Sequence, residues 1–169
     1  GVIVARACDA DLKSIAQEYL FSPINAEVGE WLMLLDGYYS GLAGLHISAR
    51  DMARFGLLYL NDGQYEGKQL LSVDYVRDSL QRYSEGLPSP GYFSDRGYGY
   101  QWWSARVGDR EFNYAAGHGG QMVVLLDELD MVIVTTSDPF WQQHDEESWK
   151  HESAIIKLVG KFIKSLPEV

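Results

Sequence analysis

The segment with the clearest chemical potential is Gly117-His118-Gly119-Gly120-Gln121, which lies between two strand-like runs. Glycine tolerates positive φ angles and allows a close approach of the backbone, so three glycines around a histidine can turn backbone N–H groups toward a bound group. The same composition is also typical of a tight hairpin that simply needs positive φ angles. The residues alone leave both interpretations open.

No self-contained catalytic or metal-binding set accompanies this segment. The sequence holds no Gly-x-Ser-x-Gly elbow, no His-Glu-x-x-His pair and no cysteine pair with metal spacing. His144 and His151 stand near the acidic residues 145–147, but on a helix they would lie two turns apart, too far for one ion. We interpret this stretch as a polar loop that runs into a solvated helix start, where acidic residues are favoured. The sequence therefore implies no metal and no organic cofactor.

Composition and charge narrow the classes of partner. The 169 residues suffice for one domain with a hydrophobic core. A formal net charge of −10 and a pI near 4.7 argue against a nucleic acid or an anionic membrane surface, because both attract basic proteins. Cys8 is the only cysteine, so no disulfide can form within the chain. No apolar run approaches the roughly 20 residues that a membrane-spanning helix needs.

The first half of the chain, residues 1–83, is predicted to be mainly helical. It opens on an apolar stretch without a capping residue, which suggests a start in the middle of an element. A helix is expected from Asp11 to about Ser22-Pro23, then an irregular segment over 24–47. Two further helices are expected, one capped by Ser48 and a shorter one that follows Ser72. The expected inward face of the first helix is Leu12, Ile15, Ala16, Tyr19 and Leu20, and the expected buried stripe of the second is Met52, Phe55, Leu58 and Tyr59. The third helix carries Val73, Val76 and Leu80.

The second half, residues 98–169, is predicted to be an antiparallel sheet with a closing helix. After a loop at 84–97, strand-like runs cover 98–105, 111–117, 121–126 and 131–136, and their short connections imply hairpins in sequential order. The last two runs are nearly all apolar, so both faces of those strands should be covered. A helix from about Glu146 should face inward through Ile155, Leu158, Val159 and Phe162. Helices followed by a meander and a covering helix predict an α+β fold.

Four segments follow one another in a recognisable order. They are residues 38–56, which end in Ser48-Ala49-Arg50-Asp51-Met52-Ala53-Arg54-Phe55-Gly56; residues 58–63 with 67–72; residues 98–103, Tyr-Gly-Tyr-Gln-Trp-Trp; and residues 117–121 with the apolar run that ends at 134–137. Together they resemble the serine β-lactamase-like, or penicillin-binding-protein-like, hydrolases: class C β-lactamases, related esterases and 6-aminohexanoate-dimer hydrolases. The resemblance spans nearly the whole chain, residues 1–169.

The resemblance implies a serine hydrolase of which this chain is the C-terminal part. Members of the family use a Ser-x-x-Lys nucleophile, a Tyr-x-Asn loop and a Lys-Thr-Gly or His-x-Gly strand. None of the fourteen serines here has a lysine three positions later. The single Tyr-x-Asn match, Tyr59-Leu60-Asn61, ends a predicted helix with its tyrosine in the buried stripe, so we interpret it as a chance match. The first two motifs are expected upstream of Gly1, and the chain alone should be inactive.

The resemblance places the third motif at the Gly-rich segment in one of two registers. In the His-x-Gly register, residues 118–120 form the motif and the Gln121 N–H is the oxyanion-hole donor. In the Lys-Thr-Gly register, residues 115–117 take those positions and the His118 N–H is the donor. Neither register supplies a lysine cation, which argues against true β-lactam hydrolysis. Tyr100 and Trp102, expected on one face of their strand, and Trp103 on the other are candidate walls of the substrate pocket, with core packing as the equal alternative.

Partners and location follow from the same resemblance. The implied substrate is a small ester, amide or lactam, and the missing N-terminal part of the domain is an implied partner. Because loss of that part would expose apolar surface, we expect the chain alone to dimerise, exchange elements or aggregate. The family favours a periplasmic or extracytoplasmic location, and a cytoplasmic one stays open. The rival interpretation is a binding or regulatory relative that kept the cleft without the nucleophile.

Overall fold

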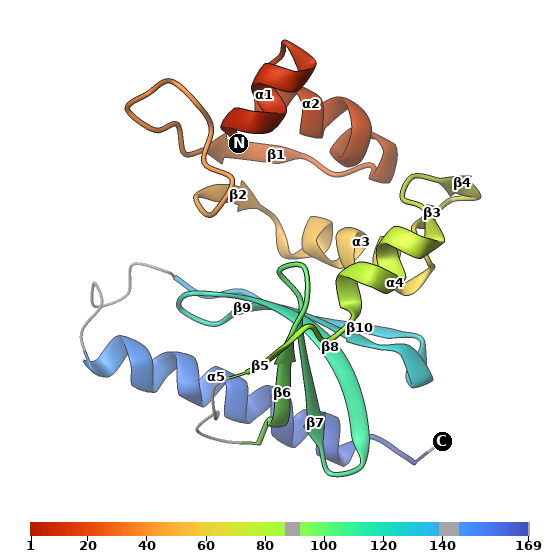
Figure 1. Ribbon diagram of the computed structural model, residues 1–169. Helices are drawn as coiled ribbons and strands as arrows, with labels where there is room; N and C mark the ends of the chain where they lie inside the picture. Colours follow the sequence, from red (N-terminus) through yellow and green to blue (C-terminus); the bar gives the residue numbers. More distant parts are fainter. Residues whose placement is uncertain (87–91, 139–145, 169) are drawn as a thin grey trace.

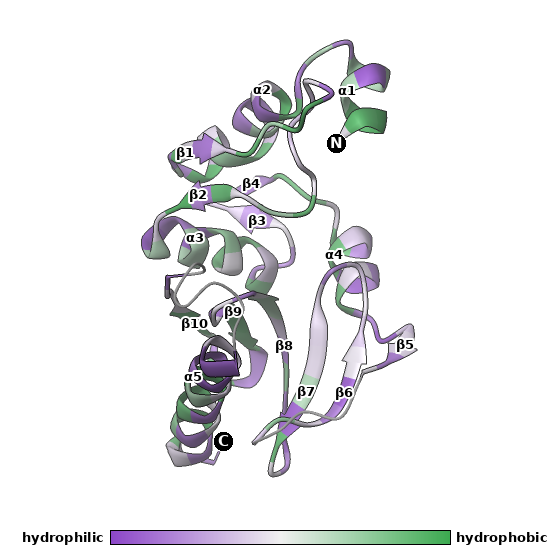
Figure 2. Cartoon of the chain, turned by 90° about the vertical axis from the view of Figure 1, so that its left-hand side faces the viewer, coloured by the Kyte–Doolittle hydropathy of each residue, from purple (hydrophilic) through white to green (hydrophobic). Residues whose placement is uncertain are grey.

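The computed structural model describes residues 1–86, 92–138 and 146–168. A six-stranded antiparallel sheet forms its centre, with one long helix over one face and two shorter helices over the other (Figure 1). The N-terminal helices and a small two-stranded sheet lie beyond those shorter helices. The expected α+β architecture is present. Figure 2 shows that the most hydrophobic strands lie between the two helical layers, as a buried centre requires.

The N-terminal region is helical but irregular. Its elements are α1 (Val2–Cys8), α2 (Leu12–Ala16), a π-helical turn η1 (Gln17–Phe21) and a 3₁₀ turn η2 (Ser22–Ile24). Asp11 caps α2 by accepting a hydrogen bond from Ser14 N at 3.0 Å, as predicted for the start of this helix. The prediction that Tyr19 is buried is wrong, because its side chain is 68% exposed. The wider π turn changes the period of 3.6 residues on which that prediction relied, and Phe21 and Ile24 occupy the core instead.

The segment predicted to be irregular contains a small sheet. Strands β1 (Val28–Trp31) and β2 (Leu45–Ile47) pair antiparallel, and the Trp31 ring N–H donates to Ser40 O at 2.8 Å. These strands are too short for their alternation to stand out in the sequence, which is why a loop was predicted there.

Helix α3 (Ala49–Leu60) confirms the predicted Ser48 cap, and helix α4 (Val73–Leu80) follows Ser72 as predicted. Ser48 Oγ accepts from Asp51 N at 3.1 Å, and Ser72 Oγ accepts from Tyr75 N at 3.2 Å. Leu58 and Tyr59 are buried, as predicted for the stripe of α3. A hairpin of β3 (Gln64–Tyr65) and β4 (Lys68–Gln69) connects the two helices.

The central sheet confirms the predicted sequential order. Its strands are β5 (Ser84–Glu85), β6 (Ser94–Tyr98), β7 (Trp103–Val107), β8 (Arg110–Gly117), β9 (Gln121–Leu126) and β10 (Met131–Thr135), in the order β10-β9-β8-β7-β6-β5. A 3₁₀ turn, η3 (Asp127–Leu129), joins β9 to β10. The predicted strand 98–105 is wrong, because Gln101 has a φ of 64° and Gly99 N bonds to Trp102 O, so a turn separates β6 from β7. The predicted loop 84–97 contains β5 and most of β6, and its residues 87–91 lie outside the described residues.

Strand β9 connects the two hydrophobic layers. Met122, Val124 and Leu126 belong to the core cluster beneath α5, whereas Val123 and Leu125 belong to the cluster beneath α3 and α4. Both faces of β9 are therefore covered, as predicted. Strand β10 is the last strand of the described sheet and is half-buried along its length.

Helix α5 (Glu146–Ser165) starts where the sequence predicted, but its inward face differs. Val159 and Ile163 are buried, whereas Leu158 is 65% exposed and Phe162 is 46% exposed, so the prediction for those two residues is wrong. The inward stripe is the neighbouring one, Ile156, Val159, Ile163 and Leu166, and Ile155 is half-buried on its flank. An apolar pattern on two adjacent stripes of a helix does not by itself show which stripe faces the core.

Candidate functional site

The Gly-rich segment is the turn between β8 and β9, which we call the β8–β9 turn (residues 117–121). Gly117 and Gln121 face each other as the last pair of the ladder, and Gly120 N donates to Gly117 O at 3.2 Å. Gly119 and Gly120 have φ angles of 88° and 94°. Residues other than glycine rarely adopt these φ angles. The hairpin interpretation therefore explains two of the three glycines.

The turn also packs against α5. Gly119 N donates to Glu152 Oε2 at 2.9 Å, and His118 Nδ1 lies 3.4 Å from the same oxygen. The His118 ring meets the Trp149 ring edge to face, with 4.9 Å between the ring centroids. The imidazole therefore lies against the helix, and its side chain is 27% exposed.

Two peptide groups of the turn have defined directions. Gly117 O points into the turn, where it accepts from Gly120 N; the N–H of His118, in the same trans peptide, therefore points out of the turn. Gly120 O accepts from Thr135 Oγ1 of β10 at 2.7 Å, so the N–H of Gln121 points away from β10, toward β8. Among the two amides that the sequence suggested as donors, the outward one belongs to His118.

The three aromatic candidates lie at the same end of the sheet, since Trp103 pairs with Tyr114 only three residues before Gly117. They do not share a strand as predicted, because Tyr100 lies in the turn between β6 and β7. The Tyr100 side chain is 52% exposed and its ring stacks on that of Tyr83 at 5.1 Å. That contact, through a side-chain hydrogen bond, raises the pKa of Tyr83 to about 12.

Both tryptophans pack in the core, on opposite faces of the sheet. Trp102 is buried against Tyr59 of α3, with ring centroids 4.7 Å apart. Trp103 belongs to the layer beneath α5, and the Arg96 guanidinium lies 4.3 Å from the centroid of its ring. Their packing agrees with the core alternative that the sequence left open, and their contact with a substrate stays a prediction.

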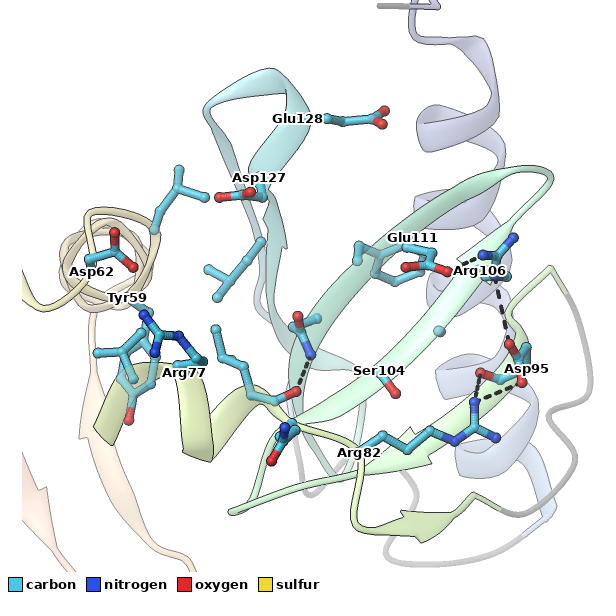
Figure 3. Close-up of a pocket in the computed structure, with 18 of the residues that line it drawn as sticks. Tyr59, Asp62, Arg77, Arg82, Asp95, Ser104, Arg106, Glu111, Asp127 and Glu128 are labelled. Atoms are coloured by element: carbon cyan, nitrogen blue, oxygen red, sulfur yellow. Dashed lines mark hydrogen bonds and ion pairs between the residues drawn. The ribbon is translucent and has the colours of Figure 1, made fainter. Parts of the chain in front are cut away.

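A cavity of about 750 Å³ lies between helices α3 and α4 on one side and strands β6 to β9 on the other (Figure 3). Figure 3 shows Tyr59 and Asp62 on one side and a row of charged residues on the other: Arg82, Asp95, Arg106 and Glu111. Arg82 Nη1 lies 2.7 Å from Asp95 Oδ1, and this hydrogen bond lowers the pKa of Asp95. Arg106 contacts both Asp95 and Glu111. The cavity shares no residue with the β8–β9 turn.

The contact of Glu152 with the turn was not predicted from the sequence, and neither were two contacts of Ser137. Ser137 Oγ lies 2.7 Å from His151 Nε2, and Ser137 O accepts from the Gln121 side chain at 3.0 Å. The acids at the start of α5 were interpreted as a solvated helix start, and His144 of that stretch lies outside the described residues. Glu152 is 33 residues away from Gly119 along the chain, and no local motif signals that contact.

Among residues 1–86, 92–138 and 146–168, no group of three or more His, Cys, Asp or Glu side chains could hold a metal ion. Over the same part of the chain, no helix is both long enough and apolar enough to cross a membrane.

Comparisons with known proteins agree with the fold. The family model named Beta-lactamase matches residues 8–153. A 6-aminohexanoate-dimer hydrolase of Paenarthrobacter ureafaciens is 28% identical over 171 aligned positions, which cover 97% of this chain and 43% of that protein. The solved structure of a putative 6-aminohexanoate-dimer hydrolase from Bacillus anthracis is 27% identical with a TM-score of 0.73, covering 98% of this chain and 42% of that one.

The chain thus spans less than half the length of these two relatives. Because the family match extends over most of its residues and the fold agrees over nearly all of them, the chain belongs to the beta-lactamase family.

Proposed function

We propose that this chain is part of a serine hydrolase that cleaves an ester or amide bond through an acyl-enzyme, and that it supplies the β8–β9 turn as one wall of the oxyanion hole. The observation that carries the proposal is the outward His118 N–H in a Gly-rich turn of a beta-lactamase family member. Both relatives bear the name 6-aminohexanoate-dimer hydrolase, which supports a small amide among the substrates.

The nucleophile in this proposal comes from outside the chain, since no serine here has a lysine three positions later. The part of the domain that carries the Ser-x-x-Lys and Tyr-x-Asn motifs is then the natural partner of the surfaces left open. These include Ile3, Leu35, Leu42 and Leu158, exposed by 84%, 109%, 91% and 65%. Large exposed apolar groups of this kind favour association with another surface.

The turn acts on charge that develops during the reaction. When the serine Oγ bonds to the substrate carbonyl carbon, the C=O electron pair moves onto the oxygen, and the His118 N–H donates to that oxyanion. The carbonyl then re-forms as the amine or alcohol leaves with the proton that the serine hydroxyl gave up. Water adds to the acyl-enzyme in the same way, and the serine leaves with a proton from that water as the acid is released. One such donor contributes about 3 kcal/mol to the transition state.

The His118 imidazole is the competing chemical group in the turn. In our proposal its role is structural, because the ring lies against Glu152 and Trp149. In the alternative, the imidazole faces the substrate as an acid or base. Replacement by alanine keeps the amide and removes the ring, so this single substitution separates the two alternatives.

The test compares two variants of the full-length protein that carries this chain, assayed with a p-nitrophenyl ester and a linear amide. We expect His118→Ala to keep most of the kcat, and Gly120→Val to lose about a hundredfold or more, because the donor is displaced. His46→Ala, an exposed histidine of β2, and Gly108→Val, in an open turn, are the matched controls.

Each other outcome contradicts part of the proposal. A loss of about a hundredfold in kcat with His118→Ala, together with a changed pH profile, would establish the imidazole alternative. Full activity of both variants would remove the site from this turn. A full-length protein without any hydrolytic activity would support the non-catalytic relative instead.

A further inference from the structure

Helix α5 contacts the β8–β9 turn through one of its stripes. Trp149, Glu152 and Ile155 follow one another at intervals of three residues, and each contacts a different part of the turn. Trp149 packs on the His118 ring, and Glu152 accepts from the Gly119 N–H. A Cβ on Gly120 would lie only 2.6 Å from Ile155 Cδ1, so Ile155 packs directly against this glycine. Helix α5 therefore packs against the three central residues of the turn, 118–120.

Glu152 makes the polar contact in this support. One carboxylate oxygen accepts from Gly119 N at 2.9 Å and lies 3.4 Å from His118 Nδ1, so two consecutive residues of the turn share it. The Glu152 side chain is only 21% exposed, which limits competition from water. A hydrogen bond to an ionised acceptor is about twice as strong as one between neutral groups.

This contact fixes the peptide group that follows the proposed donor. The Gly119 N–H and the His118 C=O belong to one planar peptide, so Glu152 sets the orientation of that plane. The His118 N–H belongs to the preceding plane, and Thr135 holds the plane after Gly120. The planes before Gly119 and after Gly120 are both fixed, so these two glycines, which would otherwise rotate freely, keep the turn and its donor in place.

We infer that Glu152 is a positioning residue for the oxyanion hole: it holds the β8–β9 turn through Gly119 so that the His118 amide meets the developing oxyanion. This inference rests on the proposed function. The carboxylate contacts Gly119 N and the His118 ring rather than the proposed donor, so it acts through the turn. Its removal should therefore lower kcat and leave KM nearly unchanged, since a donor aligned to the oxyanion acts in the transition state.

The experiment uses the full-length protein with Glu152→Ala, Glu152→Gln and the control Glu146→Ala, whose side chain is exposed on the same helix. Hydrogen exchange over residues 117–121 reports the contact directly. We expect exchange to accelerate about tenfold or more in Glu152→Ala, and less in Glu152→Gln, whose amide oxygen still accepts. Exchange in β9 and the control variant should stay unchanged, which separates loosening of the turn from general unfolding.

The kinetic measurement then tests positioning. We expect kcat to fall about tenfold in Glu152→Ala with KM unchanged, and Glu152→Gln to recover most of the loss. Unchanged exchange in Glu152→Ala, or faster exchange with unchanged kcat, overturns the inference while the proposed function survives. If the wild-type protein does not hydrolyse its substrates, the proposed function fails, and the catalytic role of Glu152 fails with it, even where exchange confirms the contact.

Discussion

The hairpin turns at the two ends of β8 each contain a glycine with a positive φ angle, and they differ in what surrounds that glycine. The β7–β8 turn contains Gly108, with a φ of 64° and open space where its Cβ would be. The β8–β9 turn contains Gly120, with a φ of 94° and Ile155 in that place. A positive φ angle therefore explains a glycine in both turns, whereas a close neighbour makes the glycine irreplaceable in only one.

Alanine substitution should make this difference measurable, and it has the largest expected effect. Gly120→Ala combines backbone strain with a steric clash, so we expect about 3 kcal/mol of lost unfolding free energy. Gly108→Ala has only the strain, at about 1 kcal/mol. Urea unfolding of both variants gives the two values. Equal losses would mean that Ile155 yields without cost and that the two turns do not differ.

The hydrogen bond from Thr135 to the β8–β9 turn allows a more specific test, with a smaller expected loss of unfolding free energy. Thr135→Val keeps the shape of the side chain and removes the hydroxyl that donates to Gly120 O at 2.7 Å. We expect a loss of about 1 kcal/mol and faster hydrogen exchange in the β8–β9 turn, with no change in the β7–β8 turn. Faster exchange in both turns would show that Thr135 stabilises the sheet in general.

The smallest expected effect is a change in the pKa of Tyr83, which contacts Tyr100 in the turn between β6 and β7. Tyr100→Phe removes the hydrogen bond that raises the pKa of Tyr83 to about 12, so the Tyr83 pKa should fall toward 10, the ordinary tyrosine value. In the wild-type protein the raised pKa favours the folded state below pH 10, and this contribution disappears as the pH rises through 12. Ultraviolet titration of the phenolate measures both variants. An unchanged Tyr83 titration would show that the stacked pair does not interact through its hydroxyls.

The sequence predicted correctly those features that depend on residues close together in the chain, such as helix caps and apolar runs. Ser48 and Ser72 cap their helices because each side chain lies beside the amide it accepts from, and the apolar run of β9 is buried because both of its faces are covered. The errors have equally physical causes. The π turn near Tyr19 changes the helical period, and Gln101 adopts a φ of 64° without being glycine, so its turn was predicted as part of a strand.

The candidate site was only half predictable. The Gly-rich segment is contiguous, so the sequence showed the turn and its two possible donors. Glu152 reaches the turn from a helix 33 residues away, and its spacing within α5 resembles an ordinary solvated face. Leu158 illustrates the same limit, because its apolar character predicted burial while the described part of the chain leaves it 65% exposed.

The adjacent tryptophans, Trp102 and Trp103, have a consequence for folding. One peptide bond joins the two hydrophobic layers, since one indole lies beneath α3 and the other beneath α5. A slip of this hairpin by one residue would exchange the two rings between layers, with both large side chains on the wrong face. We therefore expect the pair to fix the strand register, and we expect the two layers to unfold together, with both indoles reporting the same transition.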